Sequence, residues 1–395
     1  MVKQTLIKNG LDILAEEYLD YADKYFTRTR IILENEGINP RVRYQEFARK
    51  GGEVRGLDES VNFIREVTKA KAKDEVRIYA LRNGEHYAPC EPLMKLEGRI
   101  QDLVELETLY LGLTSSGLTG SINIEEVRRK AKAIVNAAQG KPVHYFGARH
   151  FHPFLDREIA EICKEEGFAG CSTDTGAEAW NAKGMGTEPH ALIVTYASYM
   201  DENRIKGNPT VEATKGFDRN IGPEVPRIVL PDTFNREITD SIETARAVPS
   251  LRGIRIDTCG ENYAQGADRM PKEGPAFEDG ENWNFRGYWS QKGVSISAVW
   301  NLREALIRNG LANLEITVSS GFNEEKTAVF LEADAFFRQR YGLELFHSIG
   351  TGSIARPVMA TADIVAYFNE RQGKWVEMHK VGRPEIRTNR LKEVK

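Results

Sequence analysis

The sequence predicts an α/β protein, an irregular TIM-like α/β barrel preceded by an N-terminal α+β domain. From Lys141 to about residue 367, short apolar runs alternate with amphipathic stretches, which is typical of a parallel sheet with crossover helices. These runs end in glycine, hydroxyl or charged residues, as strands do at the functional face of a barrel. Residues 41–100 instead alternate apolar and polar positions and contain Asn83-Gly84, a hairpin signature that predicts antiparallel strands.

Seven or eight strands are expected in the second part of the chain, and this number favours a barrel over a doubly wound sheet. Periodicity does not report whether a sheet closes, so an open sheet stays an alternative. Helices are expected at 153–165, 238–246, 297–309 and 323–340. The expected strands are 143–147, 167–171, 191–195, 227–231, 253–257, 314–318 and 344–349, with Ile364–Tyr367 as a weak eighth element.

The pattern of apolar and polar residues changes along the chain and predicts three parts. Residues 1–110 form the α+β domain, with a helical arm followed by antiparallel strands, and residues 111–367 form the barrel. Residues 368–395 are a basic tail expected to pack on the N-terminal domain. Within the barrel, residues 260–292 are rich in glycine and aromatic residues and show no period, which is typical of a lid, a contact arm or a disordered insertion.

Composition excludes several classes of protein. The 395 residues are 41% hydrophobic and 28% charged with a net charge of −4, so the balance does not predict a nucleic-acid binder. Four cysteines without CxxC spacing predict free thiols in a reducing compartment. The N-terminus lacks the apolar core of a signal peptide, and no apolar run approaches membrane-spanning length, so we expect a cytoplasmic protein without membrane contact.

Polar residues gather where the expected strands end. Arg255 and Asp257 share one face of a strand, and a charged pair facing a barrel interior is costly unless a ligand or metal uses it. Asp232 adds a second acid after the strand 227–231. The loops 319–321 and 350–353 are rich in glycine and hydroxyl residues, whose backbone N–H groups can bind phosphate. Carboxylates beside two such loops indicate a diphosphate ligand bridged by Mg²⁺.

Each of these residues also has a purely structural interpretation. Asp232 could cap the following helix, and His190 could be a capping histidine. Phe146 and Tyr25 could be ordinary core residues. Their convergence at one end of the expected strands favours the functional interpretation, because independent structural roles need not collect there.

Taken together, the motifs resemble those of the nicotinate phosphoribosyltransferase family, in particular its shorter archaeal-type members. The resemblance covers nearly the whole chain in the same order. The matching motifs are Asp23-x-Tyr25-Phe26, Glu107-Thr108, Phe146-Gly147-x-Arg149, Gly186-Thr187-x-x-His190, Asp232-Thr233-Phe234, Arg255-x-Asp257, Ser319-Ser320 and Gly350-Thr351-Gly352.

The resemblance implies a fold, a reaction and an assembly. The fold would be an N-terminal α+β domain joined to an irregular barrel. The reaction would be phosphoribosyl transfer from 5-phosphoribosyl-1-diphosphate to nicotinate, giving nicotinate mononucleotide and diphosphate for NAD biosynthesis. The assembly would be a homodimer, or a set of dimers, with active sites shared between subunits.

The resemblance also implies a role for each matching residue. Asp257, Arg255 and His190 would be catalytic, His190 being the position that ATP phosphorylates in some members of the family. Mg²⁺ would bind Asp257 and Asp232, and ATP would be a further cofactor. Phe146 would stack on one face of the pyridine ring, and Tyr25 of the partner subunit on the other. The substrate-binding residues would be Tyr25, Phe146, Arg149, Thr187, Asp232, Ser319, Gly321, Gly350, Thr351 and Gly352.

The chain departs from the family pattern at two places, and these leave alternatives open. After Asp257 the usual Ser-Gly-Asp is replaced by Thr-Cys-Gly, so Glu261 becomes a candidate for the missing carboxylate. His150 stands where a second arginine is common. The alternatives are a decarboxylating quinolinate phosphoribosyltransferase, a variant that uses nicotinamide through Asp174, and a catalytically silent paralogue that only binds phosphoribosyl ligands. The sequence does not decide the base, the use of ATP, the number of subunits or the role of 260–292.

Overall fold

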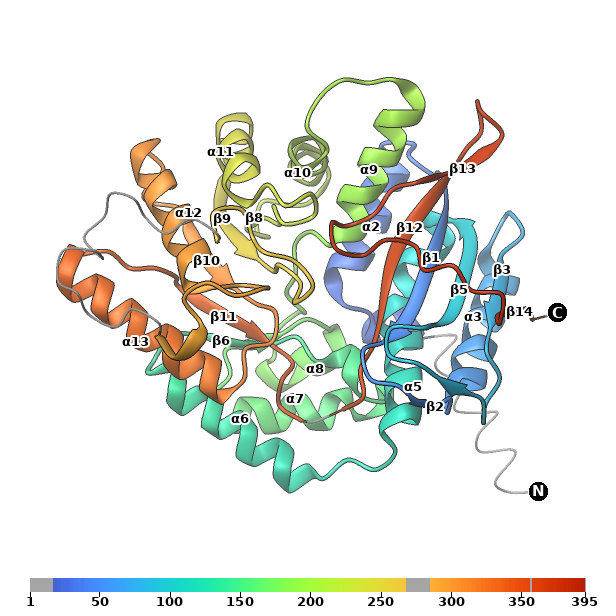
Figure 1. Cartoon of the computed structure of the whole chain (residues 1–395), viewed down its shortest axis with the longest axis horizontal. Coiled ribbons are helices and arrows are strands. Elements are labelled where there is room, and N and C mark those ends of the chain that lie inside the picture. The colour runs from blue at the N-terminus through green and yellow to red at the C-terminus, as the bar shows by residue number, and fades with distance from the viewer. Residues whose placement is uncertain (1–16, 268–284, 356, 395) are drawn as a thin grey trace.

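A computed structural model of the chain describes residues 17–267, 285–355 and 357–394. The molecule has two halves, each built around one six-stranded sheet (Figure 1). One sheet is antiparallel and contains strands from both ends of the chain, and the other is parallel. Each sheet has its own hydrophobic core. None of the described helices is long and apolar enough to cross a membrane.

The antiparallel sheet has β1 (Arg41–Ala48) near its centre, paired on one side with β5 (Pro92–Arg99) and on the other with β12 (Ala360–Asn369). Its full order is β13-β12-β1-β5-β3-β14. A two-stranded sheet, β2 (Gly52–Glu53) with β4 (His86–Tyr87), lies beside it. The other members and the helices of this half are β3 (Arg77–Ala80), β13 (Lys374–Glu377), β14 (Lys392–Glu393), α2 (Lys24–Asn35), α3 (Leu57–Lys71), α4 (Ile100–Leu103) and α5 (Glu107–Thr119).

Strand β12 corrects one prediction. Ile364–Tyr367, expected as an eighth barrel strand, belongs to β12 and runs antiparallel to β1, with Ile364 opposite Tyr44. The strand is buried because α5 and α9 (His190–Asn203) pack against it. The C-terminal residues therefore complete the N-terminal sheet, and β14 pairs with its edge strand β3.

The parallel sheet has the order β7-β6-β11-β10-β9-β8, and all of its neighbouring strands are parallel. Among the described residues β7 and β8 are edge strands that do not pair with each other, so the sheet is an open half-barrel and a closed TIM-like barrel is not observed. Its strands are β6 (Val143–Tyr145), β7 (Gly170–Cys171), β8 (Arg227–Val229), β9 (Leu251–Ile256), β10 (Glu315–Val318) and β11 (Ser348–Thr351).

The strand predicted at 191–195 is wrong. These residues lie in α9, where Ala191, Leu192, Ile193, Val194 and Thr195 are all buried. Helix α9 packs between β12 and α10 (Pro209–Asn220), and the apolar run at 191–194 lies near its start. A short apolar run of this kind does not distinguish a strand from a buried helix.

The remaining barrel helices lie where the sequence predicts them, to within a few residues. They are α7 (Asp156–Glu165), α11 (Glu237–Ala247), α12 (Ile296–Arg308) and α13 (Glu324–Tyr341), with α6 (Ile124–Ala138) and the short α8 (Asp174–Ala177) in addition. Of the irregular segment 260–292, residues 268–284 lie outside the described part, as do residues 1–16 of the predicted helical arm.

Burial predicts how much one strand residue of the parallel sheet contributes to stability. Ile254 of β9 is fully buried in the core of this half. We expect Ile254→Ala to lower the free energy of unfolding by about 2–5 kcal/mol, because it removes buried methyl groups and leaves a cavity. Urea denaturation followed by circular dichroism measures this change.

The matched control is Arg252→Ala on the same strand. The Arg252 side chain is 65% exposed, and its ion pair with Glu315 lies at the surface. Its replacement should cost no more than about 1 kcal/mol. Equal losses for the two variants would contradict the burial of β9 in this core.

Candidate active site

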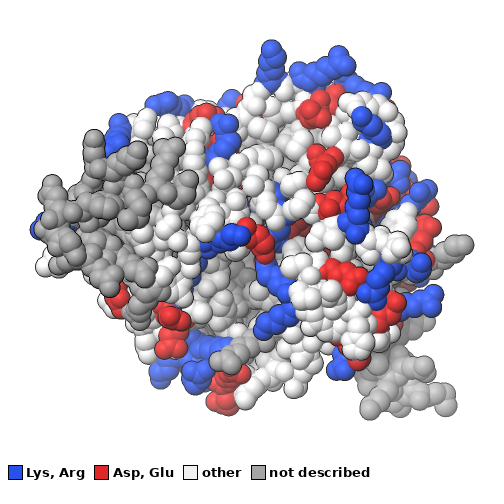
Figure 2. All heavy atoms as spheres, in the orientation of Figure 1, with Lys and Arg blue, Asp and Glu red and all other residues white. Residues whose placement is uncertain are grey.

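A cavity of about 610 Å³ lies between the two halves, at the carboxyl ends of the parallel strands. On the face drawn in Figure 2 the molecule is hollowed near its centre, and Lys and Arg side chains lie around the hollow. The predicted site residues that line the cavity are Tyr25, Phe146, Arg149, His190, Arg255, Asp257, Ser319, Gly321, Gly350, Thr351 and Gly352.

Two tight loops form one end of the cavity. After β10, Ser320 and Gly321 both adopt left-handed backbone conformations, with φ of 72° each, and α13 begins three residues later. After β11, the Thr351 hydroxyl donates to the carbonyl of Phe322 and accepts from the backbone N–H of Ser353 at 3.0 Å. The two loops are therefore joined to each other. Backbone N–H groups at such turns and at a helix N-terminus favour an anion.

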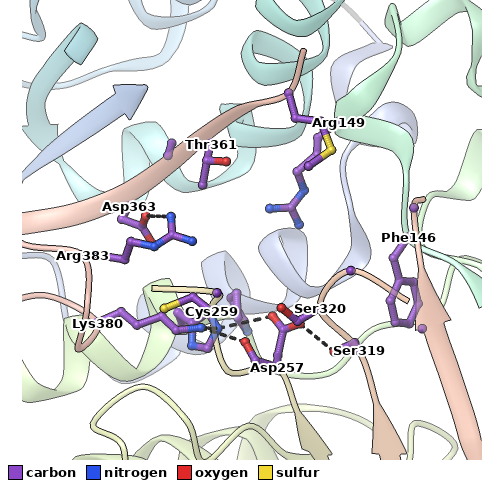
Figure 3. Close-up of a pocket in the computed structure, with 18 of the residues that line it drawn as sticks. Phe146, Arg149, Asp257, Cys259, Ser319, Ser320, Thr361, Asp363, Lys380 and Arg383 are labelled. Carbon is purple, nitrogen blue, oxygen red and sulfur yellow. Dashed lines mark hydrogen bonds and ion pairs between the residues drawn. The ribbon is translucent and has the colours of Figure 1, made fainter. Parts of the chain in front are cut away.

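Gly350 has a packing role in addition to any role in binding. A Cβ at this position would lie 2.2 Å from the Phe146 ring. Only glycine therefore lets the Phe146 ring lie against β11, and this contact fixes the ring at the cavity wall (Figure 3).

Arg255 lies between two aromatic rings. Its guanidinium carbon is 5.8 Å from the centroid of Phe146 and 5.9 Å from that of Tyr25. Among the described residues Arg255 has no hydrogen-bond or ion-pair partner, although aromatic faces stabilise it as a cation. A free guanidinium on a cavity wall is suited to a carboxylate or a phosphate.

Tyr25 reaches the cavity from its own chain. The resemblance implied that the partner's Tyr25 would fill this place, but α2 is held directly against the half-barrel. The Lys24 N–H donates to the Ser172 carbonyl at 2.8 Å, and the Arg28 guanidinium donates to the carbonyl of Gly186. These bonds at the end of β7 place Tyr25 beside Arg149, whose guanidinium carbon is 5.6 Å from the ring centroid.

Arg149, unlike Arg255, is already paired. Its guanidinium is 3.2 Å from Asp23 Oδ2 and 3.4 Å from Glu107 Oε1. Burial, with a contribution from nearby acids, raises the pKa of Glu107 well above its usual range. Asp23 also accepts a hydrogen bond from the Thr108 hydroxyl at 2.9 Å, so these groups orient Arg149 toward the cavity.

His150 adds no charge to this wall. Its Nδ1 lies 3.1 Å from the Gly352 carbonyl, to which it donates. Burial, reinforced by the charge of Arg149, lowers the pKa of His150 to about 4. The residue that replaces the family's second arginine is therefore neutral near pH 7.

Lys380, from the C-terminal tail, contacts Asp232, His190 and Asp257. Lys380 Nζ is 2.5 Å from Asp232 Oδ2, 2.7 Å from His190 Nε2 and 3.1 Å from the Asp257 carbonyl. Because an ammonium group only donates, His190 Nε2 accepts and Nδ1 carries the proton, which it donates to Thr233 Oγ1 at 3.0 Å. Burial disfavours the charged lysine, but Asp232 and Asp257 outweigh it and raise the pKa of Lys380.

Asp257 faces the cavity as a carboxylate. Its side chain is 29% exposed, and Oδ1 accepts a hydrogen bond from the Ser319 hydroxyl at 2.7 Å. Burial opposes ionisation, but the positive charges of Arg255 and Lys380 hold the pKa of Asp257 well below its usual range. Figure 3 shows Asp257, Ser319 and Lys380 on the wall opposite Arg149.

This arrangement fits a magnesium ion at Asp257 better than at Asp232. Asp232 is fully buried against the Lys380 ammonium, which already supplies its counterion. Glu261 is paired with Arg383 at 3.1 Å and with Arg49 at 2.8 Å, and it does not supply the missing carboxylate. No cluster of three or more His, Cys, Asp or Glu side chains suited to a metal occurs in the described residues. An ion held by Asp257 would take its other ligands from the bound diphosphate and water.

Two predicted substrate-binding residues, Thr187 and Asp232, lie outside the cavity wall. The alternative of a nicotinamide-specific variant is also not supported by the structure. The Thr187 hydroxyl donates to the Ile228 carbonyl at 2.8 Å, and Asp232 is behind Lys380. Asp174, the acid that a nicotinamide-specific variant would use, binds Lys24 at 2.7 Å and the Gly184 N–H at 2.9 Å. It does not line the cavity.

Sequence reasoning missed several cavity residues, among them Lys326, Lys380 and Arg383. Lys380 and Arg383 stand in the stretch predicted as a basic tail, and only the tertiary structure brings them to the site. Lys326 is in the first turn of α13, shortly after the loop 319–321. This position in the sequence was the one indication that Lys326 could lie in the site.

Comparisons with known proteins agree with the resemblance to the nicotinate phosphoribosyltransferase family. A family model described as the N-terminal domain of quinolinate phosphoribosyl transferase matches residues 23–116. A nicotinate phosphoribosyltransferase from Mycobacterium tuberculosis is 26% identical over 203 residues, which are 50% of this chain and 41% of that relative. The chain thus aligns with less than half of that relative's length.

A solved structure of low sequence identity has a similar fold. Nicotinate phosphoribosyltransferase from Porphyromonas gingivalis has 12% identity and a TM-score of 0.60, with 92% of this chain and 93% of that chain covered. Nicotinate-nucleotide pyrophosphorylase from Pyrococcus furiosus has 28% identity over 94% of this chain and 82% of that chain, with a TM-score of 0.41.

The Lys380–Asp232 pair predicts a large loss of stability when one partner is removed. Lys380→Met leaves a buried carboxylate without its cation, so we expect the free energy of unfolding to fall by about 3–5 kcal/mol in urea denaturation. The double variant Asp232→Asn with Lys380→Met removes both charges and should recover most of this loss.

The control is Lys374→Met on β13, where the lysine is exposed and the change should stay within about 0.5 kcal/mol. A double variant as unstable as Lys380→Met alone would show that the loss is not caused by the unpaired carboxylate.

Proposed function

We propose that this chain is a pentosyltransferase that transfers the phosphoribosyl group of 5-phosphoribosyl-1-diphosphate to nicotinate, giving nicotinate mononucleotide and diphosphate for NAD biosynthesis. One observation carries the proposal: an arginine with no ion-pair partner among the described residues, beside two aromatic rings, shares a cavity with two glycine-rich loops and an ionised aspartate. The M. tuberculosis relative and the P. gingivalis structure, both named nicotinate phosphoribosyltransferases, support it.

The aromatic end of the cavity suits a flat, anionic base. The nicotinate carboxylate would pair with Arg255, and the pyridine ring would lie against Phe146 and Tyr25, the two rings that flank this arginine. Tyr25 belongs to the same chain in this proposal. The ring nitrogen would then point toward the sugar held by the loops.

The glycine-rich end suits the sugar phosphate. The loops 319–321 and 350–352, with the N-terminus of α13, would bind the 5′-phosphate. Displacement at the anomeric carbon passes through an oxocarbenium-like state and needs no protein nucleophile. Catalysis then depends on positioning the base nitrogen and stabilising the leaving diphosphate. A magnesium ion held at Asp257 would supply charge neutralisation, and Asp257 itself would face the reacting ribose.

ATP coupling through His190 is a separable part of the proposal. His190 Nε2 accepts a hydrogen bond from Lys380, so its lone pair is engaged. Phosphorylation at Nε2 therefore requires Lys380 to move away, whereas a positioning role for His190 does not. ATP would raise the rate only in the first case.

The second candidate is quinolinate phosphoribosyltransferase, which the matching family model favours by its name. A base with two carboxylates needs more than one free cation beside the ring. Arg255 has no ion-pair partner in the described part of the chain, but Arg149 is paired with Asp23 and Glu107, and His150 is neutral near pH 7. His152 does not line the cavity and lies 3.6 Å from Glu59. The positive charge available at this wall therefore favours a base with one carboxylate, such as nicotinate, over quinolinate.

The proposed location is based on the cysteines, and the proposed assembly is based on the family resemblance. Four free cysteines support a reducing compartment such as the cytoplasm. The homodimer rests on the family resemblance alone.

The test is mononucleotide formation from phosphoribosyl diphosphate and Mg²⁺ with nicotinate, nicotinamide or quinolinate, each with and without ATP. We expect product from nicotinate, and an ATP-dependent rise only if His190 is phosphorylated. Product from quinolinate alone would replace the proposal with the second candidate. No product with any base, from folded protein that binds phosphoribosyl diphosphate, would identify a silent ligand-binding paralogue.

A further inference from the structure

Lys326 is a buried lysine at the glycine-rich end of the cavity. It lies in the first turn of α13, and its residue is only 7% exposed. Its Nζ donates to the Ser320 carbonyl at 3.0 Å and lies 4.5 Å from the Phe322 ring centroid. The neighbouring loop residues Ser319, Ser320 and Gly321 line the same cavity.

The hydrogen bonding of this lysine is incomplete. An ammonium group has three N–H donors, and among the described residues only the Ser320 carbonyl accepts one. No carboxylate in the described part of the chain forms an ion pair with Lys326. Burial lowers the pKa of Lys326 to about 7, and the negative charge of Asp257 acts weakly in the opposite direction.

The charged and titratable groups around this end of the cavity do not supply a counterion. Asp257, from the end of β9, accepts a hydrogen bond from the Ser319 hydroxyl, and its carboxylate lies 3.5 Å from His190 Nε2. The other acids that line the cavity, Asp23, Glu107 and Asp363, are paired with Arg149 or Arg383. The lysines and arginines that line it besides Lys326 are Arg49, Arg149, Arg255, Lys292, Lys380 and Arg383. An anion entering the loops would therefore be the missing partner of Lys326.

We propose that Lys326 binds the 5′-phosphate of the phosphoribosyl substrate and takes up a proton from solvent when the phosphate dianion enters the two loops. The identity of the phosphate ester rests on the proposed function. The loop N–H groups and Lys326 would hold the phosphate together, with Lys326 contributing the charge.

This coupling has a defined pH dependence. Above about pH 7 the empty site holds a neutral Lys326, and binding must draw a proton from solvent, so affinity falls by up to roughly tenfold per pH unit. Below about pH 7 Lys326 is already charged, and its proton uptake disappears. At pH 8, where a sugar phosphate is a dianion, binding should take up close to one proton per site.

The experiment is isothermal titration of the full chain with ribose 5-phosphate at pH 8, in two buffers of different ionisation enthalpy. The buffer dependence of the heat gives the number of protons taken up. We expect close to one proton for the wild type. Lys326→Met should bind at least tenfold more weakly without proton uptake, and Lys326→Arg should bind nearly as tightly as the wild type, also without uptake, because arginine is always charged.

Lys292→Met is the matched control, since Lys292 lines the same cavity but is exposed. It should keep the proton uptake of the wild type. Binding by the wild type with no proton uptake would overturn the role of Lys326 and leave the proposed function standing. No binding of ribose 5-phosphate by the wild type would overturn both. Uptake that persists in Lys326→Met would assign the proton to another group and also overturn the inference.

Discussion

The ion pair between Lys380 and Asp232 holds the site together. Lys380 belongs to the C-terminal residues that follow β13 of the antiparallel sheet, and Asp232 follows β8 of the parallel sheet. The pair is fully buried, and the backbone strengthens it, since the Val381 N–H donates to the Thr233 carbonyl at 2.8 Å. Through the same ammonium, His190 and Asp257 are fixed relative to each other. The cavity between the halves thus depends on a contact between distant parts of the chain.

The distribution of charge in the cavity separates two kinds of cation. Lys380 and Arg149 are paired with acids of the protein and serve to position other groups. Arg255 and Lys326 form no ion pair with an acid among the described residues, and one lies beside the aromatic rings while the other lies at the loop 319–321. A ligand with a carboxylate at one end and a phosphate at the other would complete both. Nicotinate together with a phosphoribosyl group has this distribution of charge.

Much of the fold and site follows from local sequence. The parallel strands, their helices and the polar strand ends were predictable, because periodicity and turn residues are local signals. The helix at residues 191–195 was not predictable, because a short apolar run that is buried between β12 and α10 resembles a strand. Ile364–Tyr367 was read as a barrel strand because sequence does not specify which strand it pairs with.

Some site residues were also predictable from local sequence, whereas others depend on tertiary packing. Arg255, Asp257 and the two loops stand at strand ends and could be found from spacing. Lys380 could not be found, because its role depends on where the tail packs, and the pairing of Arg149 with Asp23 and Glu107 depends on how the two halves meet. Gly350 was predicted as a phosphate-loop residue, whereas the structure also shows a packing reason for it in the Phe146 ring.

The most direct test of this account is the base preference of Arg255→Met. The measurement is kcat/KM for nicotinate and nicotinamide in the wild type and the variant, with phosphoribosyl diphosphate saturating. The account predicts that the variant loses at least a hundredfold in kcat/KM for nicotinate, since a charge-assisted bidentate pair is removed, while the value for nicotinamide changes far less. An equal loss for both bases, or an unchanged preference for nicotinate, would contradict the assignment of Arg255 to the carboxylate.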